Sequence, residues 1–96
     1  MKKINNVIIF EPKDNVDVID LNGTKQKKSI PNGWYIQVIK FDNVFGKKCA
    51  KVDIYNTTGI MEDFSANTQR DTTLDLEEQI QRIMNFALFV LDQRKN

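Results

Sequence analysis

The C-terminal stretch TTLDLEEQIQRIMNFALFVLDQRKN, residues 72–96, has the pattern of one long amphipathic helix. Asp75 can cap this helix while Glu78 reaches back to it, and the basic residues Arg94 and Lys95 lie at the far end. These signals predict a helix from about residue 76 to about residue 94. One stripe at helical spacing is apolar along the segment, and it consists of Ile80, Ile83, Met84, Ala87, Val90 and Leu91.

Two phenylalanines, Phe86 and Phe89, lie off this stripe. A helix that covers one sheet needs a single apolar stripe, so the two rings require a second buried contact or an association between chains. We expect a homodimer whose interface includes Phe86 and Phe89. The alternative is that the segment 56–73 folds over these rings within one chain, with Met61 or Phe64 as the lid.

The sequence before residue 56 alternates between short β-branched runs and turn residues, which is typical of antiparallel strands. The run NNVIIF ends before Pro12 and predicts a strand at about residues 5–10. Asn22-Gly23 stands between two extended segments, and this pair can supply the two positive φ angles of a type I′ hairpin turn. The segment TKQKKSI that follows is rich in lysine, as edge strands often are.

Residues 34–41 and 48–55 predict a second hairpin, closed by the turn DNVFGK. Pairing Phe41 with Lys47 gives a continuous apolar face, on which Trp34, Ile36 and Val38 lie opposite Ile54, Val52 and Ala50. Trp34 is then expected in the core, facing the helix. The other face is aromatic and basic, with Tyr35, Gln37, Ile39 and Phe41 opposite Asp53, Lys51, Cys49 and Lys47.

These elements predict a single domain spanning residues 1–96, with an α+β fold in which an antiparallel sheet of four to five strands, built from hairpins, packs against one C-terminal helix. No segment approaches the roughly 18 consecutive apolar residues of a membrane helix. The single cysteine excludes an internal disulfide, so we expect a cytoplasmic protein without a membrane partner. The frequent Lys, Asn and Ile are typical of an AT-rich genome, such as that of a low-GC bacterium or its phages.

The segment NTTGIMEDFSANTQRDTT, residues 56–73, follows neither strand nor helix periodicity. It is either a long loop or a loop with one short element around IMEDF. Long loops inside compact domains often have a function. Glu62, Asp63 and Phe64 therefore make this segment a candidate acidic loop for binding a partner.

The sequence lacks the residues that most catalytic sites need. It contains no histidine, which is the commonest general base and metal ligand, and it has no glycine-rich phosphate loop. Cys49 lies near Lys48 and Lys51 but has no base partner, so we interpret it as a packed strand residue. We expect a protein that is not an enzyme and that has no cofactor and no metal site.

Antiparallel strands followed by a capped C-terminal helix, with KVDIYN as a strand and DTTLDLEEQIQRIMNF at the start of the helix, resemble the positive-cofactor-four family of single-stranded DNA-binding proteins. The resemblance covers roughly residues 33–90 and departs from the family in the long segment before the helix. It implies a homodimer packed through its helices. It also implies that Tyr35, Lys47 and Lys51 contact nucleic acid.

Two functions follow from these observations. The first is a small non-catalytic protein that occupies the surface of a partner protein, as a phage-encoded inhibitor of a host defence complex would. The alternative is a dimeric protein that binds single-stranded nucleic acid through stacked bases and lysine contacts. The residues proposed to bind nucleic acid or a partner are Lys25, Lys27, Lys28, Tyr35, Phe41, Lys47 and Lys51.

The distribution of charge decides between the two functions. Residues 1–51 contain ten lysines against five acidic residues, but pairing between sheet and helix within the fold explains this asymmetry equally well. The aromatic and basic face can likewise be covered by the N-terminal strand, by the 56–73 segment or by a second subunit. Residues 52–96 are acidic, and nucleic-acid-binding proteins are usually more basic overall. We therefore expect protein binding.

Overall fold

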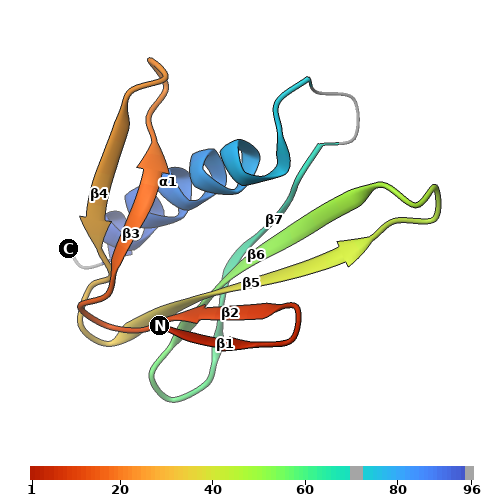
Figure 1. Cartoon of the computed structure of the whole chain (residues 1–96). Helices are drawn as coiled ribbons and strands as arrows, with labels where there is room; N and C mark the ends of the chain where they lie inside the picture. The colour runs from red at the N-terminus through yellow and green to blue at the C-terminus, as the bar shows by residue number, and fades with distance from the viewer. Residues whose placement is uncertain (70–72, 95–96) are drawn as a thin grey trace.

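The computed structural model describes residues 1–69 and 73–94, with the side chains of residues 61–63 excepted (Figure 1). Within these residues the chain forms seven strands followed by one helix. The strands are β1 (Lys2–Ile4), β2 (Val7–Phe10), β3 (Asn15–Ile19), β4 (Lys25–Ser29), β5 (Trp34–Asp42), β6 (Lys48–Asn56) and β7 (Met61–Asn67), and the helix is α1 (Leu76–Arg94). No helix in this described part combines the length and the apolar composition that a membrane crossing requires.

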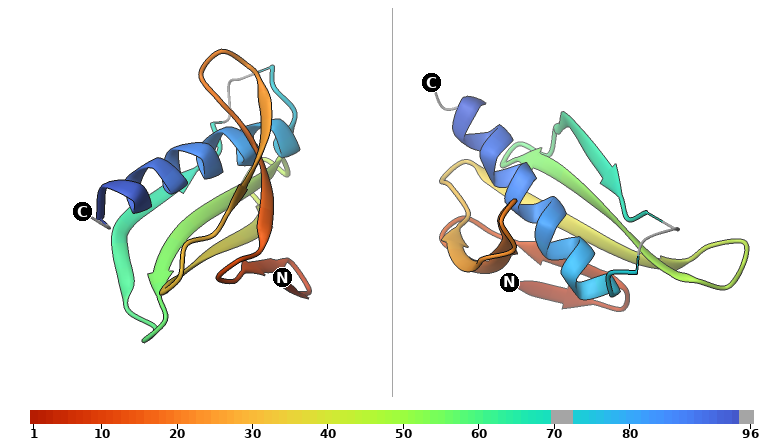
Figure 2. Two further views of the ribbon diagram at one scale, coloured as in Figure 1. Left: turned by 90° about the vertical axis from the view of Figure 1, so that its left-hand side faces the viewer. Right: turned by 90° about the horizontal axis from the view of Figure 1, so that it is seen from above.

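Five of the strands form one antiparallel sheet in the order β1-β2-β5-β6-β7. β3 and β4 form a separate two-stranded ribbon, which rises beside α1 while the helix lies across one face of the sheet (Figures 1 and 2). The predicted α+β fold, with an antiparallel sheet and a C-terminal helix, is therefore confirmed. The lysine-rich segment after Asn22-Gly23 is an edge strand, but it belongs to the ribbon and not to the larger sheet.

The core lies between α1 and the face of the sheet that we call the inner face. Ile36, Val38, Val52 and Ile54 on this face are at most 1% exposed. They belong to the same buried cluster as Ile80, Met84, Ala87 and Leu91 of α1. Burying each Ile, Val, Leu or Met side chain of this cluster stabilises the fold by roughly 1.5–3 kcal/mol relative to leaving it exposed.

Besides the sheet, α1 packs against the ribbon, which buries a second part of its broad apolar surface. β3 packs against α1 and contributes Val16 and Val18, which are buried with the helix residues. Leu88, which lies outside the predicted stripe, is 3% exposed, whereas Ile83 and Val90 within the stripe are only partly buried. The buried side of the helix is thus turned towards the ribbon, relative to the prediction.

The predicted register of the second hairpin is wrong by two residues. Trp34 pairs with Asn56, Ile36 with Ile54, and Phe41 with Cys49. Because side chains alternate with a period of two, this shift leaves every residue on its predicted face. It does move Trp34 to the end of the sheet, where the indole is partly buried against the core and not enclosed by it.

Three hairpins close with the same five-residue turn. In each turn the side-chain oxygen of an initial Asp or Asn accepts hydrogen bonds from the backbone N–H groups two and four residues later. The fourth position is a glycine with positive φ, namely Gly23, Gly46 or Gly59. Asn22 has no positive φ, so the hairpin is correctly predicted but its type I′ turn is wrong. The three turns are Asp20–Thr24, Asn43–Lys47 and Asn56–Ile60.

Candidate binding surfaces

The face of the sheet turned away from α1, which we call the outer face, carries the predicted aromatic and basic residues. β5 contributes Tyr35, Gln37, Ile39 and Phe41, and β6 contributes Cys49, Lys51, Asp53 and Tyr55. The predicted place of Lys47 opposite Phe41 is wrong. Lys47 lies in the turn before β6, and Cys49 is the residue opposite Phe41. Tyr55 lies opposite Tyr35, and their rings stack with centroids 5.2 Å apart and an interplanar angle of 7°.

Neither the N-terminal strand nor the 61–67 strand covers the outer face, although the sequence suggested both segments as covers. β2 lies in the plane of the sheet beside β5, with Val7 opposite Ile39 and Ile9 opposite Gln37. β7 lies in the same plane on the other side of β6. The N-terminal strand and the 61–67 segment therefore extend this face. This face carries six apolar and aromatic side chains that are partly or more fully exposed, on either side of the Gln37–Asp53 pair, namely Val7, Ile9, Tyr35, Ile39, Phe41 and Tyr55.

A hollow of about 310 Å³ opens on the outer face next to Tyr35. Ile9 and Gln37 line it from β2 and β5, together with Pro12, Thr57 and the charged residues Lys2 and Glu11. A hollow of this kind beside exposed rings is where an interface usually buries an anchoring side chain of the partner.

Asp53 places a negative charge in the middle of the outer face. Its side chain is 2% exposed, and the Lys51 ammonium lies 3.5 Å from one of its carboxylate oxygens. The other oxygen is buried and has no hydrogen-bond partner. The charge of Lys51 is therefore directed at a carboxylate of this chain, which leaves less positive potential for a phosphate backbone.

The lysines of β4 do not join the outer face. They belong to the ribbon on the opposite side of the sheet (Figure 1). Lys27 Nζ donates to Asp17 Oδ1 at 2.9 Å, and Lys28 Nζ donates to Asn85 Oδ1 of α1 at 3.0 Å. The predicted combination of Lys25, Lys27 and Lys28 with Tyr35 and Lys51 in one surface is therefore wrong, because the ribbon leaves the sheet to pack on the helix.

The predicted acidic loop at residues 62–64 is also corrected, because these residues belong to strand β7. The side chains of Glu62 and Asp63 lie outside the described residues. Phe64 is 8% exposed, and its ring packs on Phe86 with centroids 5.7 Å apart. Phe64 therefore packs against α1 and is not an exposed residue that could bind a partner.

Phe86 and Phe89 remain 56% exposed each, although Phe64 contacts the first of them. Their rings stack on each other with centroids 6.4 Å apart, and partly buried Ile83 and Val90 belong to the same helix. We call these four residues the Phe86 patch. The alternative in which the 56–73 segment covers the rings explains the contact of Phe64 with Phe86 but leaves Phe89 exposed. The homodimer stays a prediction.

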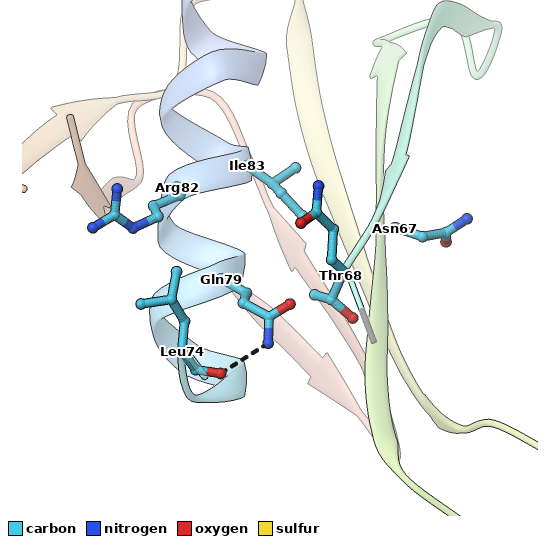
Figure 3. Close-up of a pocket in the computed structure, with 7 residues that line it drawn as sticks. Asn67, Thr68, Leu74, Gln79, Arg82 and Ile83 are labelled. Atoms are coloured by element: carbon cyan, nitrogen blue, oxygen red, sulfur yellow. Dashed lines mark hydrogen bonds between the residues drawn. The ribbon is translucent and has the colours of Figure 1, made fainter. Parts of the chain in front are cut away.

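A pocket of about 180 Å³ adjoins the Phe86 patch at Ile83 (Figure 3). Thr68 and Gln69 line it from the end of β7, and Leu74 and Gln79 line it from the start of the helix. Gln79 donates from Nε2 to the Leu74 carbonyl at 3.1 Å, while its buried Oε1 has no partner. The apolar surface of α1 thus continues into a concave site.

The most exposed aromatic side chain of the described residues belongs to Phe45, which was not among the predicted site residues. Val44 and Phe45, at the tip of the β5–β6 hairpin, are 91% and 76% exposed. The signal was present in DNVFGK, because turns are normally polar and two consecutive apolar residues in a turn contradict that pattern.

The described residues contain no group of three or more His, Cys, Asp or Glu side chains that could hold a metal ion. Cys49 is a free thiol, 5% exposed, and its S–H donates to the Lys47 carbonyl at 3.6 Å.

A scan against protein-family models, a search of curated proteins and a search of solved structures find no match to this chain. The resemblance to the positive-cofactor-four family stays a prediction.

Proposed function

We propose that the chain is a non-catalytic binding protein that acts by occupying the surface of a partner protein with the outer face of its sheet. One observation carries this proposal. The outer face bears six partly or well exposed apolar and aromatic side chains, and no described element of the chain packs over them. Antiparallel sheets that face water usually carry polar residues on that side.

The chemistry of the outer face fits a protein better than a nucleic acid. Tyrosine and phenylalanine are enriched at the centres of protein interfaces, where charged residues are depleted. Here the stacked rings of Tyr35 and Tyr55 lie beside the Gln37–Asp53 pair, and Ile39 follows one pair further along. Lys51, opposite Ile39, is directed at Asp53, and Lys2 lines the hollow next to Tyr35. An action by surface occupation in the cytoplasm, as in a phage-encoded inhibitor of a host defence complex, suits these features.

Photo-crosslinking tests this function. Benzoylphenylalanine placed at Ile39 should crosslink to one protein of defined mass in cells of the source organism. The same group at Leu21, which is 96% exposed on the ribbon, is the control and should give no such product. With the identified partner purified, Ile39→Asp should weaken binding by at least about tenfold, while Leu21→Asp should change it by less than about twofold. Equal crosslinking from both positions would contradict the proposal.

Single-stranded nucleic acid is the alternative occupant of the same face, because the Tyr35–Tyr55 pair offers ring surfaces on which bases could stack. A titration of labelled single-stranded DNA at two salt concentrations separates the two functions. Binding that weakens steeply with salt and is lost in Lys51→Glu would favour nucleic acid. We expect no binding even at low salt.

A further inference from the structure

A cleft of about 360 Å³ opens between three elements of the fold. The ribbon and the sheet diverge from each other on either side of α1 (Figures 1 and 2), and the cleft is lined by residues of all three. It lies on the helix side of the sheet, so it is separate from the outer face. Its volume falls in the range of roughly 300–1,000 Å³ that is typical of small-molecule sites.

One wall and the floor of the cleft are apolar, whereas most of the rest of its lining is polar or charged and includes Asn15 and Gln81. Ile8 and Phe10 of β2 are partly exposed and form one wall. Val16 of β3, Val38 of β5 and Ile80 of α1 are at most 4% exposed and form the floor. An apolar ligand body would therefore be buried against aliphatic and aromatic side chains.

Charged side chains stand at the rim of the cleft. The two acidic ones already have counter-ions, because Lys27 Nζ lies 2.9 Å from Asp17, and Lys40 Nζ lies 4.0 Å from Glu77. Lys3 also lines the cleft, and it makes no ion pair or side-chain hydrogen bond with the described residues. The rim thus carries one uncompensated positive charge.

Lys3 and Lys2 lie on opposite faces of the sheet. Lys3 pairs with Ile8, whose side chain lines the cleft, whereas Lys2 pairs with Ile9, whose side chain belongs to the outer face. Lys2 and Lys3 are adjacent and have the same charge, but only Lys3 faces the cleft.

From these observations we propose that the cleft binds a small amphiphile with an apolar body and a single anionic group. The body lies on Ile8 and Phe10, and the anionic group lies at the rim beside Lys3.

Methyl NMR of the full chain tests the proposal with defined probes. Decanoate and decyl phosphate are titrated separately, and the tighter of the two identifies the head group. Decyltrimethylammonium, with the same tail and the opposite charge, is the control ligand. At least one anionic probe should shift the methyl resonances of Ile8, Val16 and Val38 saturably, and the cationic probe should bind at least about tenfold more weakly.

Lys3→Glu and Lys2→Glu form a matched pair of variants. Both sites are exposed, so neither change removes a core side chain. Lys3→Glu should weaken the anionic probe by about tenfold, and Lys2→Glu by less than about twofold at physiological ionic strength. The absence of saturable shifts, equal binding of the cationic probe, or an equal loss in both variants would each overturn the proposal.

Discussion

The two faces of the five-stranded sheet are built from the same strands but have different surroundings. On the inner face, Ile36 and Val38 are at most 1% exposed beneath α1 and the ribbon. On the outer face, Tyr35 and Ile39 are only partly buried, although they alternate with those residues along β5. The apolar residues of the inner face serve the core of the chain. Those of the outer face have no such role within the described structure, which points to a surface outside the chain.

The largest expected effect tests this difference within one strand. Ile36→Ala should lower the free energy of unfolding by about 2–5 kcal/mol, because it opens a cavity in a closed core. Ile39→Ala makes the same chemical change three residues later on the outer face and should cost less than about 1.5 kcal/mol. Urea unfolding measures both values. Equal losses would mean that the outer face is as closed as the inner one.

α1 also has a buried apolar side and an exposed one, and its exposed rings Phe86 and Phe89 are the predicted homodimer interface. In a two-fold dimer through the Phe86 patch, four half-exposed rings would become buried, and Phe86→Glu with Phe89→Glu should weaken association by about 3–4 kcal/mol. Light scattering at micromolar concentrations should then change from a dimer to a soluble monomer. Val44→Glu, a change of an exposed apolar residue at the β5–β6 turn, is the control and should leave association unchanged. A wild-type chain that is monomeric throughout would exclude the dimer.

Trp34 lies at the boundary of the inner face and should give an intermediate effect. A fully enclosed tryptophan would cost about 3–5 kcal/mol on truncation to alanine. Because Trp34 is only partly buried at the end of the sheet, we expect a loss of about 1–2 kcal/mol from Trp34→Ala. A loss as large as that of Ile36→Ala would place the indole inside the closed core.

The smallest expected effect concerns Asp14, at the start of the ribbon. A hydrogen bond from the α-amino group of Met1, 2.6 Å away, and one from the Glu11 N–H hold the pKa of Asp14 below its ordinary value of 3.8. Because the folded pKa is the lower one, this contact favours the folded state above pH 3.8, and the contribution disappears as the pH falls through the depressed value. NMR titration should show the lowered pKa. Acetylation of the amino terminus should raise it towards 3.8.

Local patterns in the sequence predicted the helix, the β3–β4 and β5–β6 hairpins and the side of the sheet on which each β5 and β6 residue lies. They did not predict the β1–β2 hairpin, because NNVIIF indicates one strand, whereas the chain turns at Asn5 and Asn6. They could not fix the register, because a shift by two residues keeps every side chain on the same face, and the choice depends on the hydrogen bonds that Asn43 makes in the turn. β7 corresponds to the alternative of a short element around IMEDF. Its strand character was not predicted, because MEDFSAN does not alternate clearly, and its pairing with β6 contains an irregularity.

The candidate sites show the same limit. Tyr35, Phe41 and Lys51 lie together as predicted because they belong to one hairpin. The separation of Lys27 and Lys28 from them depends on the packing of β3 against α1, and that contact joins segments more than 50 residues apart. Local periodicity contains no information on such a contact.

The recurrence of one turn at three hairpins has a consequence for mutation. The first and fourth positions hold the backbone through the Asp or Asn side chain and the glycine, while the two positions between them point outwards, as the exposure of Leu21, Val44 and Phe45 shows. Mutations at these tips can therefore change what the protein presents without disturbing the strands behind them. Substitutions at Leu21, Val44 and Phe45 should leave the side-chain hydrogen bonds of Asp20 and Asn43 in place, and with them the paired strands.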